Sequence, residues 1–583
     1  MRIAIIDSGI GKKIDTNSNV KEAYRLEKKG SQCFLISEES IDLLGHGTAI
    51  SEIIVSENPE VELISIRIYE KFLEVDEESL FFVLEYINNN IEVDIINISA
   101  GITYLSNYER LNEICNKLHK NGIIVISAFD NNGAISFPAA FENVLGIDVE
   151  NRKGKNGIID INHSIVNLVV DDRYYRTLWN QTPTIIKGTS FACAYVTGIL
   201  SKYICDHSEE KAVLSLKKTL AVEKREIKKS ESFPKPNFEI KKAIVFPINK
   251  ESKSFLRFRN QLKFEVVGLY DEKILGKIGQ EISSLKIKSY DDIEWTEDFD
   301  TIILSYSKDI ASLTGREYQA EILENARKHN KNIYSFEKIF SDRSNVFYPT
   351  LTNDMVPFYN ISKLHKTTIP VVGVFGTSSK QGKFTLQQHI ISRINEIGYR
   401  TGFISTEPSG YLLDADFVFH YGYSAELSLD LRDYISILNE MVWKIQLKNK
   451  DIIISGAQSG IQNYNDSRVT DFNLEQQSIL LGLNPDFSIL CVNPHDELEY
   501  IKKSINYINS ICNSDVKAIV VFPVKAEKTI TGLGYITKEL CQEKIESIKR
   551  SLTTQLGLPT FAISQKKDMD KIVEFIVEDL SEG

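Results

Sequence analysis

The stretch Ile3-Ala4-Ile5-Ile6-Asp7-Ser8-Gly9 decides how the first third of the chain is interpreted. Its apolar run ends at an acid, which predicts a buried strand that presents the carboxylate of Asp7 at its carboxyl edge. Two short motifs follow at a distance, His46-Gly47-Thr48 and Gly188-Thr189-Ser190-Phe191-Ala192, and each opens a helical pattern. Taken singly, each has an ordinary structural explanation, because Asp-Ser-Gly is a common turn and Gly-Thr-Ser is a good helix N-cap.

Around these motifs, residues 1–220 alternate short apolar runs with helical patterns, which indicates an α/β domain with a mainly parallel sheet. The expected strands are residues 3–6, 62–67, 93–98, 122–127 and 144–149. The expected helices are residues 46–55, 77–88, 109–120 and 190–205. The three motifs therefore lie at strand ends or helix starts, where folding can bring their side chains together.

The motifs run in the order Asp, His, Ser, which is the chain order of the subtilisin triad. Up to about residue 205 the sequence resembles the subtilase family of serine proteases. The resemblance implies a three-layer subtilisin-like domain in which Asp7 holds the imidazolium of His46. It also implies that His46 takes the proton of Ser190, so that this serine is acylated by the peptide substrate.

Two further segments carry the resemblance. The strand pattern from Asp94 ends in Ser99-Ala100-Gly101, which resembles the family's edge of the substrate cleft. Ala128-Phe129-Asp130-Asn131-Asn132-Gly133, followed by Ser136-Phe137-Pro138-Ala139, resembles the oxyanion-hole segment. This match implies that the Asn131 amide and the Ser190 N–H stabilise the oxyanion. Ala194 departs from the family, which usually has proline there, and residues 151–187 are unlike it, so substrate preference is not implied.

The middle of the chain has a different composition. Residues 221–241 combine charge clusters with Pro234-Lys235-Pro236, which indicates a linker. Residues 242–362 have a Rossmann-like alternation of strands and helices, including an expected helix at residues 255–262. The first strand of this domain is not followed by a G-x-G-x-x-G loop, so the sequence does not predict dinucleotide binding there.

Residues 363–583 are predicted to form a P-loop α/β domain. The segment from Gly376 to Thr385, GTSSKQGKFT, follows an apolar strand and opens a helical pattern, as a phosphate-binding loop does. It resembles the loop of dethiobiotin-synthetase-like P-loop proteins. The residues expected to bind ATP or GTP are Gly376, Thr377, Ser378, Gly382, Lys383 and Thr385. A plain Gly/Ser turn before an amphipathic helix is the alternative.

A magnesium ion is expected with the nucleotide, held by Thr385 and Glu407, with the hydroxyls of Ser378 and Ser379 as alternatives to that of Thr385. The strand at residues 451–455 occupies the Walker-B position, but Ser455 stands where relatives often carry an acid. Glu407 is therefore the candidate carboxylate, with Asp414 and Asp416 as alternatives. Whether the nucleotide is hydrolysed stays open.

Bulk properties limit the partners and the compartment. A net charge of −12 argues against nucleic acid as a partner. The seven cysteines are scattered and form no CxxC pair, so neither a disulfide framework nor a structural zinc site is expected. The sequence has no apolar run of membrane-spanning length. Asp7 leaves no room for a signal peptide or pro-segment before it, and the expected location is cytoplasmic.

The expected function combines the two motif sets. The middle and C-terminal parts together resemble Rossmann-plus-P-loop proteins of bacterial peptide-maturation systems, on Ala243-Ile244-Val245-Phe246-Pro247 and Val266-Val267-Gly268-Leu269-Tyr270-Asp271. This likeness implies an endopeptidase that removes the leader of a ribosomally synthesised modified peptide, gated by or coupled to nucleotide binding. The expected partners are a precursor peptide and other maturation enzymes. The alternative is an ATP-dependent peptide-modifying transferase or ligase with an accessory protease domain.

Overall fold

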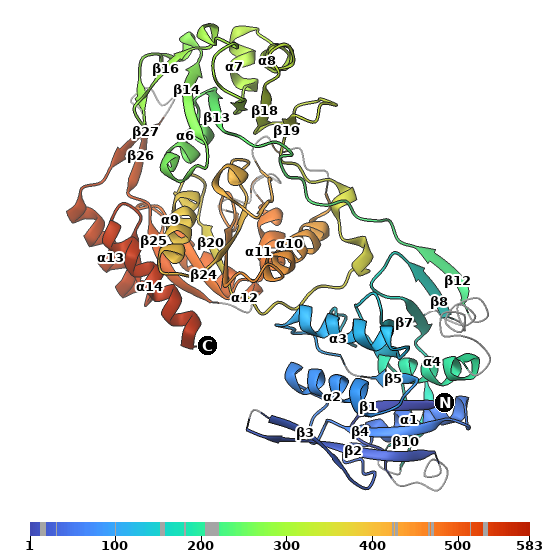
Figure 1. Cartoon of the computed structure of the whole chain (residues 1–583). Coiled ribbons are helices and arrows are strands. Elements are labelled where there is room, and N and C mark those ends of the chain that lie inside the picture. The colour runs from blue at the N-terminus through green and yellow to red at the C-terminus, as the bar shows by residue number, and fades with distance from the viewer. Residues whose placement is uncertain are drawn as a thin grey trace. The chain divides into compact units, whose positions relative to one another are not determined.

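The structure, a computed structural model, describes residues 1–11, 19–30, 32–99, 101–151, 158–179, 182–204, 221–422, 425, 429–463, 467, 472–512, 515–528 and 535–582. The chain divides into two compact units, whose elements are labelled in Figure 1. Unit 1 comprises residues 1–230 and 357–368. Unit 2 comprises residues 231–356 and 369–583.

Unit 1 is built on a mainly parallel sheet with the strand order β12-β8-β9-β7-β6-β5-β1-β4-β2-β3. Its central strands are β4 (Glu62–Arg67), β1 (Arg2–Asp7), β5 (Ile95–Ile98), β6 (Ile124–Ala128) and β7 (Leu145–Glu150). All neighbours in this central group pair in parallel. The predicted α/β class and parallel sheet are confirmed, and Asp7 is the last residue of β1.

Helices lie on both faces of this sheet. Helices α1 (His46–Glu57) and α4 (Thr189–Ile204) pack against each other and share a hydrophobic core with β1, β5 and β6. Helices α2 (Glu77–Asn90) and α3 (Tyr108–Lys120) pack together on the other side of the sheet (Figure 1). The result is a three-layer domain in which α1 and α4, the helices that carry His46 and Ser190, are neighbours.

The edges of unit 1 contain strands that the sequence did not indicate. They are β2 (Val20–Lys29), β3 (Gln32–Ser37), β8 (Ile158–Asn162), β9 (Leu168–Asp171) and the separate ribbon of β10 (Tyr175–Trp179) and β11 (Thr182–Ile186). A further edge strand, β12 (Ala221–Glu226), lies in the stretch predicted to be a linker and pairs in parallel with β8. Its charged side chains suit an edge strand, which explains why composition indicated a linker there.

The Rossmann-like part of unit 2 has the strand order β15-β16-β14-β13-β17-β18-β19. The strands are β13 (Lys242–Phe246), β14 (Glu265–Asp271), β15 (Glu281–Ile282), β16 (Leu285–Ser289), β17 (Thr301–Leu304), β18 (Asn332–Ser335) and β19 (Val346–Phe347). Its helices are α6 (Lys250–Leu256), α7 (Lys308–Thr314) and α8 (Tyr318–Lys328). Helix α6 begins earlier than the predicted helix 255–262, because Asn249 and Ser252 form a capping box at its start.

The P-loop part of unit 2 is a fully parallel sheet in the order β22-β21-β23-β20-β24-β25-β28. Its strands are β20 (Val371–Gly376), β21 (Thr401–Ser405), β22 (Phe417–Val418), β23 (Ile452–Gly456), β24 (Phe487–Val492), β25 (Val516–Val521) and β28 (Thr560–Ala562). A short ribbon of β26 (Val524–Lys528) and β27 (Tyr535–Glu539) follows β25.

Helices cover both faces of this second sheet. The core of one face joins α9 (Lys383–Glu396) and α14 (Lys566–Glu582). The core of the other face joins α10 (Leu431–Gln446), α11 (Leu474–Leu483) and α12 (Leu498–Ile511), with α13 (Gln542–Leu556) near the sheet edge (Figure 1). The strand β20 ends at Gly376, and α9 begins at Lys383. The phosphate-loop motif therefore has the strand-loop-helix setting that the sequence predicted.

The two parts of unit 2 share a hydrophobic cluster. Phe255 and Phe258 from the Rossmann-like part pack in it with Phe384 and Phe403 from the P-loop part. The expected boundary at residues 362/363 falls within residues 357–368, a segment that belongs to unit 1 although the residues on both sides of it belong to unit 2.

Candidate functional sites

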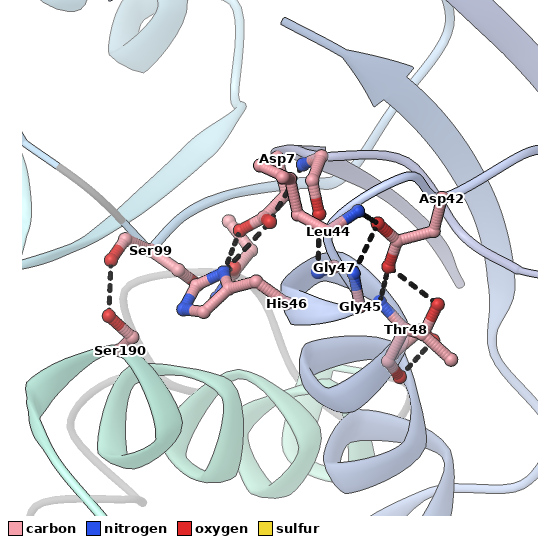
Figure 2. A network of polar contacts seen from close by, with 12 residues as sticks. Asp7, Asp42, Leu44, Gly45, His46, Gly47, Thr48, Ser99 and Ser190 are labelled. Atoms are coloured by element: carbon pink, nitrogen blue, oxygen red, sulfur yellow. Dashed lines mark hydrogen bonds and ion pairs between the residues drawn. The ribbon is translucent and has the colours of Figure 1, made fainter. Parts of the chain in front are cut away.

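Asp7 and His46 form a buried acid-imidazole pair. Asp7 is 0% exposed, and its two carboxylate oxygens lie 2.8 and 3.0 Å from Nδ1 of His46. Burial alone would lower the pKa of His46. The charge of Asp7, its hydrogen bond and the charge of Asp42 outweigh burial and raise that pKa above its usual value. This contact fixes the ring orientation, so that Nε2 lies on the side of the ring away from Asp7 (Figure 2).

Asp42 holds the start of α1 and was missed by the sequence analysis. Its Oδ1 accepts hydrogen bonds from the N–H groups of Leu44 and Gly45, and its Oδ2 accepts from the N–H and hydroxyl of Thr48 (Figure 2). Asp42 lies three residues before the N-cap Gly45, so the N-cap pattern in the sequence does not identify it, and only the folded loop brings its carboxylate to the start of α1. Gly47 is needed because a Cβ there would lie 2.1 Å from the carbonyl oxygen of Gly9.

Ser190 lies in the first turn of α4 and is 7% exposed. Its hydroxyl donates to the carbonyl oxygen of Ser99 at 2.6 Å (Figure 2). The structure therefore brings Ser190 against the predicted cleft residue Ser99, with the Asp7–His46 pair close by. Ala100 lies outside the described residues. Gly101 packs closely on the oxyanion segment, because a Cβ there would lie 3.1 Å from the carbonyl oxygen of Phe137.

The Asn131 side chain is oriented by the residue before Ser190. Its Oδ1 accepts from both the N–H and the hydroxyl of Thr189, each at 3.0 Å. Because a backbone N–H can only donate, the atom facing it is the oxygen, and Nδ2 points the other way. Gly188, with φ of 136°, allows this approach, since a Cβ would lie 3.0 Å from Oδ1. Asn131 itself is exposed, as a group that meets substrate must be.

Two aromatic rings line the imidazole. The Trp179 ring from β10 makes an edge contact with His46 at a centroid distance of 5.7 Å, and Phe191 lies at 5.4 Å. Trp179 comes from the stretch 151–187, whose sequence gave no indication of a role.

Cys193, next to Ala194 in α4, is buried and receives a hydrogen bond from the Asn97 amide at 3.4 Å. Burial raises the pKa of its thiol, which disfavours the nucleophilic thiolate form.

In unit 2 the phosphate-loop segment folds tightly on its own side chains. The Gln381 side chain lies inside the loop: its Oε1 accepts from the N–H of Ser378 at 3.0 Å, and its Nε2 donates to the hydroxyl of Thr377 at 2.5 Å. Thr377 in turn contacts Asp496, which follows β24. Of the predicted loop residues, Thr377 and Ser378 thus have partners that would have to be exchanged for phosphate oxygens.

Lys383 is a buried cation at the start of α9. Its Nζ donates to the carbonyl oxygens of Ser378 at 2.7 Å and Ser459 at 3.0 Å. Burial is the main reason that its pKa is lowered to about 8. A polyphosphate anion would supply the negative charge that these neutral carbonyls lack, so Lys383 and the surrounding N–H groups fit such a ligand.

The residues expected to hold magnesium fit less well. Phe384 occupies the position directly after the lysine and packs in the hydrophobic cluster, so Thr385 is one residue, or about 100° of helix rotation, further on. Glu407 is close enough to Lys383 for their charges to interact, but burial raises its pKa. Ser455, at the Walker-B position, donates to the carbonyl of Ile404. Among the described residues, no group of three acidic, histidine or cysteine side chains could hold a metal ion.

Comparison with known proteins agrees with both motif sets. Residues 1–221 match the subtilase family, and residues 359–573 match a family described as a "Domain of unknown function (DUF1611_C) P-loop domain". The chain therefore carries a subtilase domain followed by a DUF1611 P-loop domain. No curated protein matches the sequence. Across the described residues, no helix has the length and apolar character needed to cross a membrane.

Several solved structures are similar to parts of the chain. A DUF1611 family protein from Anabaena variabilis is 13% identical, with a TM-score of 0.41, and the match covers 58% of this chain and 100% of that one. A lanthipeptide protease is 16% identical, covering 40% and 81%, with a TM-score of 0.31. An epidermin leader peptide processing serine protease from Staphylococcus aureus is 17% identical, covering 41% and 70%, with a TM-score of 0.30.

Proposed function

We propose that the subtilase domain is a serine endopeptidase in which Ser190 is the nucleophile. The observation that carries this proposal is that Nδ1 of His46 donates to the carboxylate of Asp7, with Ser190 at the start of the adjacent helix. Rotation of the Ser190 side chain away from Ser99 would direct its hydroxyl to Nε2 of His46, the base. His46 takes the proton as the serine attacks, and Asp7 stabilises the imidazolium.

Asn131 supplies the second part of the chemistry. Because Thr189 holds its oxygen, the Nδ2 group is available to donate to the oxyanion, together with the Ser190 N–H at the positive end of α4. Ser99, Ala100 and Gly101 are proposed to pair with the substrate backbone, with the Ser99 carbonyl released when Ser190 turns. After acylation, His46 returns the proton to the leaving amine, and water then hydrolyses the acyl-enzyme.

Replacement of Ser190 tests this assignment. Ser190→Ala should abolish labelling by a fluorophosphonate probe and lower peptide cleavage by about 10⁶ in kcat. Ser56→Ala, at an exposed serine of α1 in the same domain, is the matched control and should leave both unchanged. Cleavage that persists in Ser190→Ala would show that another group performs the reaction.

We further propose that unit 2 binds ATP or GTP through Lys383, with the nucleotide gating the peptidase. The support is a buried lysine that donates to two carbonyl groups, in a strand-loop-helix setting. Lys383→Met should remove nucleotide binding in calorimetry. Lys503→Met, which removes an exposed lysine of α12, should not. Unchanged affinity in Lys383→Met would contradict the phosphate site.

The proposed substrate is a precursor peptide whose leader is removed at one site, within a maturation system. Incubation with a diverse peptide library should then give cleavage at a narrow sequence motif, whereas a digestive protease would cleave broadly. The alternative, an ATP-dependent transferase or ligase, rests on the same buried Lys383. It would be favoured by ATP consumption that accompanies bond formation on a peptide and persists in Ser190→Ala.

A further inference from the structure

Residues 357–368 pack on unit 1 beside the two segments that the proposed function assigns to the peptide cleft. Leu364 pairs in parallel with Ala134, three residues beyond Asn131, and its carbonyl accepts from the N–H of Ile135 at 3.0 Å. Lys366 pairs in parallel with Tyr104, three residues beyond Gly101. The segment therefore runs along the ends of both cleft segments.

The two cleft segments are themselves joined at this point. Ile102 and Phe137 exchange backbone hydrogen bonds, each of 2.8 Å, in an antiparallel bridge. Residues 364–366 bridge to both of these segments, at Ala134 and at Tyr104, so this strand adjoins the part of the domain that the proposed function assigns to the cleft.

Specific contacts hold the segment in place. Lys363 forms a largely buried ion pair with Asp148 at 2.8 Å, and its ammonium lies over the Phe129 ring at 5.4 Å. The carbonyl of Tyr359 accepts from the N–H of Ile165 at 3.2 Å. Ile361 has a φ of 50°, a left-handed conformation that costs a β-branched residue about 1–3 kcal/mol. Such strain persists only where the surrounding contacts determine the backbone, which indicates a specific position rather than a loose connection.

The chain connects this segment directly to the proposed nucleotide site. Met355 and Val356 before it, and Ile369 and Val371 after it, belong to the core of unit 2. Val371 begins β20, which ends at Gly376 of the phosphate loop. The segment is thus an excursion from unit 2 that completes a surface of unit 1.

We propose that residues 363–366 form a wall of the peptide-binding cleft, and that Lys366 selects peptides with an acidic side chain near the scissile bond. Lys366 is exposed beside the exposed Tyr104, whereas the charge of Lys363 is paired with that of Asp148. The exposed side chain of Lys366 is long enough to reach a peptide that binds beside Gly101. The inference rests on the proposed endopeptidase function and assigns part of its specificity to a segment outside the first 230 residues.

Charge reversal in the full chain tests the proposal. Peptide pairs that carry Glu or Lys at successive positions are compared by kcat/KM. Wild type should prefer Glu at one position, and Lys366→Glu should reduce or invert that preference by roughly fivefold or more. Lys120→Glu, the same change at the exposed end of α3, should leave the preference intact. Fluorophosphonate labelling of Ser190 should stay within about twofold in both variants, because it needs only the triad and the oxyanion hole.

A preference that is unchanged in Lys366→Glu would overturn the proposal. Binding of the same peptides to Ser190→Ala, with and without Lys366→Glu, gives a second readout by fluorescence anisotropy that needs no catalysis. Failure of the endopeptidase assignment is a different result, namely that the wild-type protein is neither labelled by the probe nor cleaves any peptide.

A separate experiment tests the contact that holds the segment. Lys363→Met and Asp148→Asn should each raise KM across all peptides, and the double variant should be little worse than either single one, because both remove the same contact.

Discussion

The two motif-bearing sites of this chain differ in how completely the structure assembles them. In unit 1, a strand end and two helix starts bring Asp7, His46 and Ser190 to one place, and Asn131 is oriented by the residue before the serine. In unit 2, Lys383 is buried at the start of its helix, but the loop before it is filled by Gln381. Phe384 separates Lys383 from the expected hydroxyl of Thr385. In both sites the motif correctly predicts the strand, loop and helix that carry it. Whether the side chains can hold a ligand depends on the exact position of each residue within that loop.

Among the changes that test how the catalytic groups are oriented, Asp7→Asn should give the largest effect. An asparagine amide facing Nδ1 favours the wrong imidazole tautomer, so Nε2 can no longer act as the base. We expect kcat to fall by about 10⁴, the size seen for this change in another serine protease. Asp76→Asn, at the N-cap of α2, is a matched control that should affect stability but not kcat. A loss below tenfold would mean that Asp7 does not orient His46.

The sequence predicted those parts of unit 1 whose signals are local. A buried strand that ends at Asp7 and a helix that opens at His46 follow from hydrophobic pattern and turn residues, so their positions could be predicted residue by residue. Edge strands such as β12 could not, because the charge of Glu223 to Glu226 resembles a linker and only pairing with β8 makes it a strand. The positions of Trp179 and of residues 363–366 could not be predicted from the sequence for the same reason. Only tertiary packing places Trp179 against His46 and residues 364–366 beside Tyr104 and Ala134.

Asn131→Ala should lower kcat by about 10²–10³ with little change in KM, because the amide acts on charge that develops in the transition state. This is the size measured for such a donor in another subtilase. Asn132→Ala, at the exposed neighbour, should have no comparable effect. Equal losses in the two variants would indicate that the loop is disturbed as a whole rather than that an oxyanion donor is lost.

The pH dependence of cleavage should reflect the raised pKa of His46. The base must be neutral, so kcat/KM should rise with pH and fall about tenfold for each unit below the His46 pKa. Because Asp7 and Asp42 raise that pKa, the acidic limb should lie above the ordinary value of about 6.5. Asp42→Asn should move the limb to lower pH, measured on a peptide without ionisable side chains. A limb that does not move would assign the titration to another group.

Proton uptake on nucleotide binding is the smallest effect and tests the less complete site directly. The Lys383 pKa is lowered to about 8. At pH 8, about half of the lysines are therefore neutral, and a polyphosphate that raises the pKa again should take up about half a proton per site. Calorimetry in buffers of different ionisation enthalpy measures this uptake, which should diminish toward pH 6 as the free lysine becomes charged. Affinity should likewise fall between pH 7 and pH 9, since the neutral form must first gain a proton. Binding without any buffer dependence at pH 8 would mean that the phosphates do not reach the buried ammonium and that the nucleotide binds outside the loop closed by Gln381.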